Sequence, residues 1–143
     1  MRKKLVSIRI CVFNEIENIP ILTQQIKQIF DVGLQNYDYE IIFSDNKSTD
    51  GTREWIIANA AKDKHIKAIF NSNNMRDGSG LNLCKVDSGD CAIFMGGDLQ
   101  DPTDMIPKFI EAWESGYKIV IGIKSKSEEN KLMFIVRSYF LSQ

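Results

Sequence analysis

Short apolar runs alternate with segments of helical periodicity along most of this chain. The runs are rich in β-branched and aromatic residues and cover residues 5–13, 39–44, 65–70, 90–95 and 117–123. Each run is nearly continuous in apolar residues, which is typical of strands that are buried on both faces of a parallel sheet. The pattern therefore predicts an α/β fold with three layers, in which a mostly parallel sheet carries helices on both faces.

Apolar residues recur at helical spacing between and after the predicted strands. Helices are predicted at residues 19–30, 55–60, 81–86, 109–115 and 125–139. Pro20 stands in the first turn of its helix, where proline is tolerated, whereas Pro107 implies that its helix starts late or bends. Gly116 ends that helix.

Composition limits the classes of protein that fit this pattern. The chain has 143 residues, of which 43% are hydrophobic and 26% charged, and its net charge is -1. These values predict a single globular domain over residues 1–143 and give no electrostatic reason to expect a nucleic-acid partner. Three cysteines without a CxxC pair indicate reduced thiols in the cytoplasm. No stretch approaches the roughly 18 apolar residues that a membrane-spanning helix needs.

Polar residues follow three of the predicted strands. They are Asn14 and Glu15 after the first strand, Asp45 and Asn46 after the second, and Asp98 and Gln100 after the fourth. Parallel strands bring their carboxyl ends to one edge of the sheet, and ligands of open α/β folds bind there. The sequence therefore predicts a ligand site at this edge.

Simpler structural roles are also open to these residues. Asn14 and Glu15 can begin a helix, and residues 45–50 are rich in turn and cap formers. Asp98 lacks such a role, because Asp101, followed by Pro102, is the better cap for the next helix. The adjacent Gly96 and Gly97 remove side chains where a group must approach the backbone closely. Asp98 therefore points most directly to a ligand.

Three segments resemble, in order and spacing, motifs of the inverting family 2 glycosyltransferases, whose nucleotide-sugar-binding fold is called GT-A. VFNEIENI (12–19) is similar to the first nucleotide loop, and YDYEIIFSDNKSTDGT (37–52) to the second strand and base-binding loop. GDCAIFMGGDLQDP (89–102) is similar to the metal-binding segment. The YDYEIIFSD and DLQDP parts are most like the branch that transfers sugars to polyprenyl phosphates. The resemblance implies the Rossmann-like, nucleotide-binding half of a GT-A fold.

The resemblance also implies roles for individual residues. It implies that Asp45 binds the nucleotide base and that Glu15 lies near the ribose. Further substrate contacts are implied for Phe13, Asn14, Asn46 and Gly97. Asp45→Ala is then expected to weaken nucleotide binding at least about tenfold and to leave the melting temperature nearly unchanged.

A divalent cation, Mg²⁺ or Mn²⁺, is implied by the third segment. Asp98 matches the carboxylate that holds this cation against the donor diphosphate, and Gln100 matches a position that joins the metal sphere. Such hard cations prefer oxygen ligands and keep several waters. Gly96 departs from the family pattern, because it replaces the first aspartate of an Asp-x-Asp. One carboxylate of the metal segment is therefore missing.

Other departures concern basic residues and length. Ser72 stands where the family often has a basic residue, for which Arg76 is a candidate substitute, and Lys124 matches a basic position that faces phosphate. The resemblance covers only the donor-binding portion of the family's domain. We therefore expect a chain truncated before the acceptor-binding part, inactive by itself, with any general base beyond residue 143.

The expected activity is metal-assisted transfer of a sugar, with inversion, from a nucleotide-diphosphate sugar to a sugar or a polyprenyl phosphate. This activity belongs to cell envelope polysaccharide biosynthesis, in the cytoplasm or, by peripheral association of the full-length protein, at the inner face of the membrane. The alternative is a non-catalytic nucleotide or nucleotide-sugar binding module, which Gly96 and the missing acceptor half favour. A dinucleotide-binding oxidoreductase is poorly supported, because no GxGxxG follows the first strand.

Overall fold

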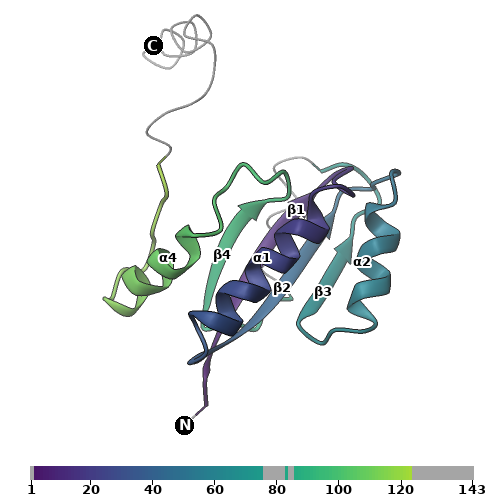
Figure 1. Ribbon diagram of the computed structural model, residues 1–143. Coiled ribbons are helices and arrows are strands. Elements are labelled where there is room, and N and C mark those ends of the chain that lie inside the picture. The colour runs from purple at the N-terminus through teal and green to yellow at the C-terminus, as the bar shows by residue number, and fades with distance from the viewer. Residues whose placement is uncertain (1, 76–82, 84–85, 124–143) are drawn as a thin grey trace, which may run out of the picture.

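A four-stranded parallel sheet forms the centre of the fold (Figure 1). The computed structural model describes residues 2–75, 83 and 86–123. The strands are β1 (Lys4–Val12), β2 (Tyr37–Asp45), β3 (Ile66–Phe70) and β4 (Cys91–Gly96), in the order β3-β2-β1-β4. The helices are α1 (Ile19–Val32), α2 (Thr52–Ala60) and α4 (Met105–Glu114). The predicted α/β fold with a parallel sheet is confirmed.

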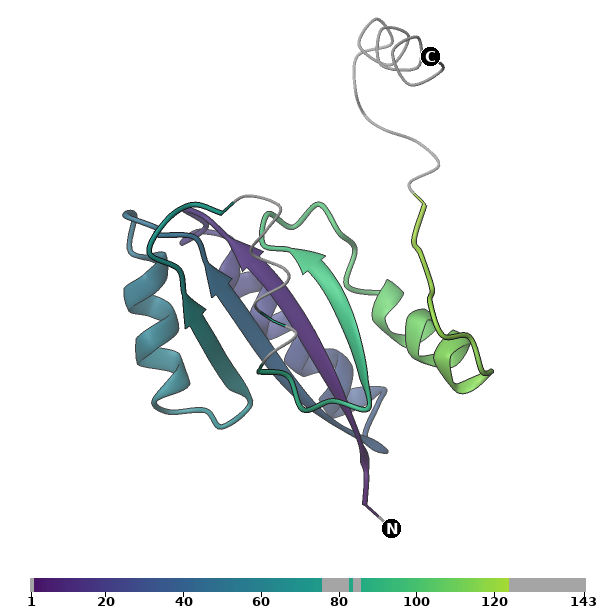
Figure 2. The ribbon, with the colours of Figure 1, turned by 180° about the vertical axis from the view of Figure 1, so that it is seen from behind.

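One face of the sheet carries the hydrophobic core. Val6, Ile8 and Ile10 of β1 have no exposed surface, and Ile56 of α2 and Ile106 of α4 join the same buried cluster. The buried side of α1 packs there as well, and Figure 2, seen from behind, shows α1 beyond the sheet. Alternate strand residues thus serve this face, as the pleat of a strand requires.

The opposite face of β1 and β2 is polar and holds the segment that leads into β4. Glu40 accepts hydrogen bonds from the Ser7 hydroxyl at 2.6 Å and from the Ser88 backbone N–H at 2.8 Å, and it pairs with Lys67. Burial favours the neutral form of this carboxyl. The hydrogen bonds from Lys67, Ser7 and Ser88 outweigh it, so that the pKa of Glu40 lies below its usual value. A buried charge here is acceptable because it is fully paired.

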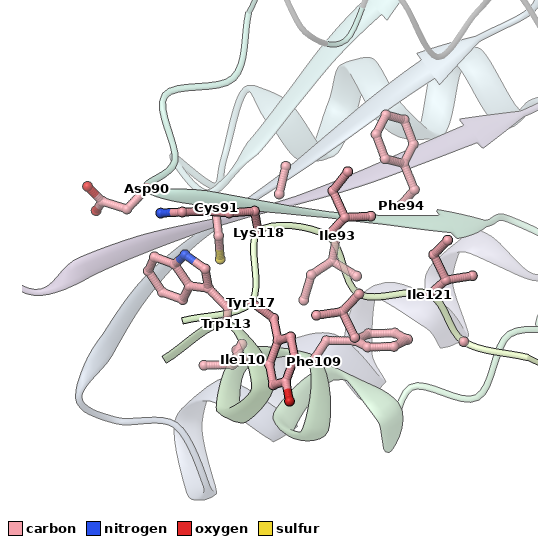
Figure 3. Close-up of a pocket in the computed structure, with 14 residues that line it drawn as sticks. Asp90, Cys91, Ile93, Phe94, Phe109, Ile110, Trp113, Tyr117, Lys118 and Ile121 are labelled. Atoms are coloured by element: carbon pink, nitrogen blue, oxygen red, sulfur yellow. The ribbon is translucent and has the colours of Figure 1, made fainter. Parts of the chain in front are cut away.

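The predicted fifth strand at residues 117–123 is wrong. Residues 117–123 form no part of the sheet, and Ile119, Ile121 and Ile123 are 80%, 75% and 87% exposed. Part of this segment, residues 117–122, lines an apolar groove of about 630 Å³ along the edge of β4 and beside α4 (Figure 3). A β-branched run becomes a strand only when a neighbouring backbone pairs with it, and among the described residues β4 ends the sheet on this side.

One predicted helix begins at a different residue in the structure, and others cannot be compared with it. α4 begins at Met105, earlier than its apolar pattern indicates, and Pro107 falls in its first turn. The helix predicted at 125–139, most of the one at 81–86, and the candidate basic residues Arg76 and Lys124 lie outside the described residues. In the part of the chain that the structure describes, none of the helices has the length and apolarity that a membrane span requires.

Candidate functional site

The carboxyl ends of β1, β2 and β4 meet at one edge of the sheet, as predicted. The strand register sets Val12 opposite Asp45 and Cys11 opposite Gly96, so the segments that follow the three strands start side by side. Glu15 confirms this closeness, because its Cγ lies 3.6 Å from the place that a Cβ on Gly97 would take. The edge therefore brings the predicted polar segments together.

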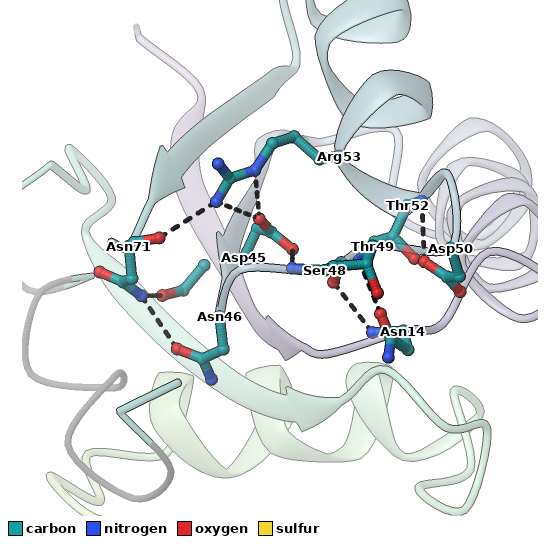
Figure 4. Close-up of polar contacts among 10 residues, drawn as sticks. Asn14, Asp45, Asn46, Ser48, Thr49, Asp50, Thr52, Arg53 and Asn71 are labelled. Carbon is teal, nitrogen blue, oxygen red and sulfur yellow. Dashed lines mark hydrogen bonds and ion pairs between the residues drawn. The ribbon is translucent and has the colours of Figure 1, made fainter. Parts of the chain in front are cut away.

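The segments after β1 and β2 are joined by hydrogen bonds (Figure 4). The Asn14 backbone N–H donates to the Ser48 hydroxyl at 2.9 Å, and the Thr49 N–H donates to Asn14 Oδ1 at 2.8 Å. The Glu15 N–H donates to the Thr52 hydroxyl at 2.8 Å. Asn14 has a φ of 56°, a left-handed conformation that asparagine adopts more readily than most residues. We call residues 13–18 and 45–53 together the loop pair.

Asp50 spans the loop pair. One carboxylate oxygen accepts the Ile16 N–H at 3.1 Å and the other accepts the Thr52 N–H at 3.0 Å. Burial acts against ionisation, but the hydrogen bonds from Thr52 and Ile16 outweigh it and hold the pKa of Asp50 below its usual value. The alternative interpretation of this stretch as turn and cap residues therefore describes Asp50 well.

Asp45 is fully buried at the end of β2. Its Oδ1 accepts the Ser48 N–H at 3.1 Å, and its Oδ2 lies 2.7 Å from both Nε and Nη2 of Arg53. The guanidinium also stands over the ring of Phe70, 5.1 Å from its centroid. Because the carboxylate is held inside the chain, the expectation that Asp45→Ala spares the melting temperature no longer follows. The contact of Asp45 with a base stays a prediction.

Sequence reasoning missed Arg53 and Asn71. Arg53 stands in the first turn of α2, where the helix dipole favours acidic residues, so a basic residue there is a signal that a partner carboxylate is near. Its Nη2 also donates to the Asn71 carbonyl at 3.1 Å. Asn71 follows β3, after which the sequence offered only Arg76 as a candidate. Its amide nitrogen donates to Ser44 Oγ and to Asn46 Oδ1, both at 3.0 Å.

The segment after β4, residues 96–101, which we call the β4 turn, makes mostly local contacts. Asp98 Oδ1 accepts the Gln100 N–H at 3.1 Å, and both side chains belong to exposed residues. The prediction that Asp101 caps the helix α4 is wrong. The Oδ2 of Asp101 instead accepts the Gly96 N–H at 2.8 Å, and the residue at the N-cap is Asp104. The chain thus folds back on Gly96 before α4 begins.

Gly97 is required by packing inside the chain. A Cβ at this position would lie 2.7 Å from Cγ1 of Val12 and 3.4 Å from the Cys11 carbonyl oxygen. At Gly96 a Cβ would instead meet carboxylate oxygens, Asp98 Oδ1 at 3.0 Å and Asp101 Oδ2 at 3.4 Å. The two glycines therefore have different neighbours, one apolar and one acidic.

Comparison with known proteins identifies the family. The family model described as glycosyl transferase family 2 matches residues 7–138. The chain belongs to this family.

Two curated relatives agree with the predicted branch of family 2. The bactoprenol glucosyl transferase of Shigella phage SfX is 32% identical over 130 residues, which are 89% of this chain and 42% of that protein. The undecaprenyl-phosphate 4-deoxy-4-formamido-L-arabinose transferase of Aeromonas hydrophila is 34% identical over 129 residues, which are 89% of this chain and 39% of that protein. The predicted resemblance to the polyprenyl-phosphate branch is confirmed. The chain spans about two fifths of the length of these relatives.

A solved structure confirms the fold of this family 2 chain. The crystal structure of S. aureus TarS 1-349 superposes with a TM-score of 0.64 at 14% identity, over 87% of this chain and 40% of that one. At this identity the likeness concerns the fold, and it agrees with the Rossmann-like α/β architecture that the sequence predicts.

The β4 turn offers oxygen atoms for the divalent cation that family 2 membership implies. Asp98 and Gln100 offer exposed side-chain oxygens, and the carboxylates of Asp98 and Asp101 both flank Gly96. Among the described residues there is no group of three or more His, Cys, Asp or Glu side chains that could hold a metal ion alone. The donor chemistry therefore fits a hard cation that takes most of its oxygen ligands from water and from a bound phosphate.

The remaining predicted contacts differ in how open they are. Phe13, directly after β1, is 45% exposed, and Asp98 and Gln100 belong to exposed residues. Asn46 is only 5% exposed and Asp45 is closed off completely. The β1 and β4 ends of the edge thus present side chains to solvent, whereas the β2 end is built into the fold.

Proposed function

We propose that this chain is the donor-binding part of a glycosyltransferase that moves a sugar from a nucleotide-diphosphate sugar to an acceptor with inversion. The observation that carries the proposal is the family 2 match over residues 7–138, whose three characteristic segments meet at one edge of the sheet. The names of the two relatives support a polyprenyl phosphate as the acceptor. Such an acceptor implies peripheral association of the whole protein with the inner face of the membrane.

The residues of the edge divide the work of binding the donor. Asp98 and Gln100 would hold Mg²⁺ or Mn²⁺, which neutralises the charge that develops on the departing nucleoside diphosphate. Glu15, whose Cγ lies 3.6 Å from the position that a Cβ on Gly97 would take, would contact the ribose. The ion pair of Asp45 and Arg53 would stabilise the end of β2, where the base would bind. A phosphate acceptor is already nucleophilic, so the transfer requires no general base from this chain.

A second candidate is a non-catalytic nucleotide-sugar binding module. Gly96 favours it, because the position where the family has a carboxylate offers only a backbone N–H that is already bound to Asp101. The two candidates differ in what the metal does. A transferase site needs the cation against the diphosphate, whereas a binding module can hold the nucleotide without it.

Calorimetric titration tests the proposal. The chain is titrated with UDP-, GDP- and dTDP-sugars across a Mn²⁺ series. We expect binding of one donor to strengthen with Mn²⁺ and, by linkage, Mn²⁺ binding to strengthen by the same factor when that donor is present. Asp98→Asn should abolish the metal dependence. Asp104→Asn is the matched control, because it makes the same change at an exposed residue whose side chain forms no cap hydrogen bond.

The outcome separates the two candidates. If Asp98→Asn keeps the metal response of the parent protein, Asp98 is not a ligand and the binding module becomes the better assignment. If no nucleotide sugar binds with or without Mn²⁺, both candidates are wrong.

A further inference from the structure

Asn46 is a buried polar residue with one half of its amide engaged. Its backbone N–H donates to the Val12 carbonyl at 2.9 Å, which fixes the residue beside the end of β1. Its side-chain oxygen accepts a hydrogen bond from Asn71 at 3.0 Å. Its amide nitrogen has no partner among the described residues, although the residue is only 5% exposed, and in Figure 4 this nitrogen points away from Asn71. The nitrogen therefore keeps a hydrogen-bond donor for an acceptor on a ligand.

Asn71 determines which end of the Asn46 amide faces outward. Its own N–H donates to the Asp45 carbonyl at 2.9 Å, and its carbonyl accepts from Arg53, so the backbone is held on both sides. Both hydrogen bonds from its side-chain nitrogen end on oxygens, those of Ser44 and Asn46. An amide nitrogen has two donors and no acceptor. With Asn71 in this orientation, Asn46 turns its oxygen to Asn71 and its nitrogen outward.

The strand order indicates which part of a nucleotide would meet Asn46. Asn46 and Asn71 follow β2 and β3, whereas the β4 turn lies on the other side of β1. On the proposed function, the diphosphate sits with the cation at the β4 turn. The far end of the nucleotide, which is the base, then lies at the β2 and β3 ends.

We propose that Asn71 is a positioning residue that makes Asn46 a hydrogen-bond donor to a carbonyl oxygen of the nucleotide base. The inference rests on the proposed function and adds a selectivity to it. The site then favours bases that carry a carbonyl where their counterparts carry an amino group, uracil over cytosine and guanine over adenine. An amino group would place donor against donor and give the Asn46 nitrogen no acceptor.

The test uses substitutions at Asn71 and Asn46, which should both reverse the preference for a carbonyl base. Asn71→Asp replaces the donor with a carboxylate that only accepts, so the Asn46 amide turns over and presents its oxygen to the ligand. Asn46→Asp presents an acceptor directly. Dissociation constants are measured by calorimetry for the pairs UDP and CDP, and GDP and ADP, at neutral pH. We expect the parent to favour the carbonyl base of the pair that it binds by about tenfold, and both variants to reverse that preference.

Two further variants control the result. Asn36→Asp makes the same charge change at an exposed residue just before β2, at the opposite end of that strand, and should keep the preference of the parent. Asn71→Ala removes the restraint without adding charge, so Asn46 can turn either way and the preference should fall toward equality. It also serves as the second test if Asn71→Asp does not give a cooperative thermal transition.

Several results would overturn the inference. A parent that binds both bases of a pair equally contradicts the donor role of Asn46. A preference that reverses in Asn46→Asp but persists in folded Asn71→Asp and Asn71→Ala contradicts the role of Asn71 alone. A parent that binds no nucleotide contradicts the proposed function itself, and with it this selectivity.

Discussion

The loop pair and the β4 turn occupy the same edge of the sheet but are held in different ways. In the loop pair, side chains of one segment bind the backbone of the other, as Asn14, Ser48 and Asp50 do. In the β4 turn, the carboxylates of Asp98 and Asp101 bind backbone groups only two and five residues away. The chain itself therefore supplies most partners in the loop pair, with the Asn46 amide nitrogen as an exception, whereas the β4 turn keeps exposed oxygens that a cation and a phosphate would complete.

The largest expected effect on stability comes from breaking the ion pair between Arg53 and the buried Asp45 in the loop pair. Arg53→Met leaves the Asp45 carboxylate, which has no exposed surface, without its cation. We expect the free energy of unfolding to fall by about 3 kcal/mol, because an unpaired buried charge is strongly destabilising. Urea denaturation at neutral pH measures the change.

Arg2→Met is the matched control for that prediction. Arg2 pairs with Asp90 at 2.7 Å, but their side chains are 74% and 31% exposed. Such exposed pairs contribute about 1 kcal/mol or less. Equal losses in the two variants would mean that burial of Asp45 has no energetic consequence, and the contrast between the two regions would lose its basis.

The two adjacent glycines give the second prediction. Gly97→Ala forces a Cβ to within 2.7 Å of Val12 in the packed edge, and we expect a loss of about 2 kcal/mol from overpacking. Gly96→Ala meets the carboxylate end of exposed Asp98, which can move aside, so its loss should stay below about 1 kcal/mol. Urea denaturation of both variants compares them. A larger loss for Gly96→Ala would show that the β4 turn is the more rigid region.

The strands of the sheet and the edge where the polar segments meet could be predicted from the sequence, because the patterns that indicate them are local. Apolar runs predicted β1 to β4, and parallel order then placed Asp45 and Asp98 at one edge. Local patterns could not show that, within the part of the chain that the structure describes, no strand pairs with residues 117–123. They also could not show that Gly97, after β4, faces Val12 of β1, a contact that joins residues far apart in the chain.

At the candidate site the sequence indicated residue types but not the contacts that these residues make within the chain. Asp45 was expected at a base, yet its immediate partner is Arg53, eight residues along the chain on α2. Asn71 was overlooked because a single asparagine after a strand is common in turns. Its importance appears only when the ends of β2 and β3 are seen next to one another.

The third prediction sharpens the contrast by supplying the missing carboxylate to the β4 turn. Gly96→Asp brings a third carboxylate beside Asp98 and Asp101, so affinity for Mn²⁺ without nucleotide should rise about tenfold, or 1.4 kcal/mol. Calorimetric titration with MnCl₂ measures it. Gly96→Asn has nearly the same size without the charge and should gain less. No gain in Gly96→Asp would mean that the oxygens of this turn do not converge on a cation.

The smallest expected effect concerns acid and the loop pair. Hydrogen bonds from Thr52 and Ile16 outweigh burial and depress the pKa of Asp50 below its usual 3.8. A carboxyl with a depressed folded pKa stabilises the fold at pH values above its unfolded pKa, and this contribution is lost as the pH falls through the folded pKa. Asp50→Asn should therefore cost about 0.5 kcal/mol near pH 7, after allowance for solvent screening, and almost nothing near pH 2.

The measurement is the difference in unfolding free energy between parent and Asp50→Asn at several pH values. Asp63 also titrates in acid. Burial opposes its ionisation, but Lys27 and His65 outweigh burial and lower its pKa to about 2. It is present in both proteins, so the difference isolates Asp50. A difference that does not change with pH would mean that the Asp50 carboxylate gains nothing from its charge, and that the loop pair is joined by neutral hydrogen bonds alone.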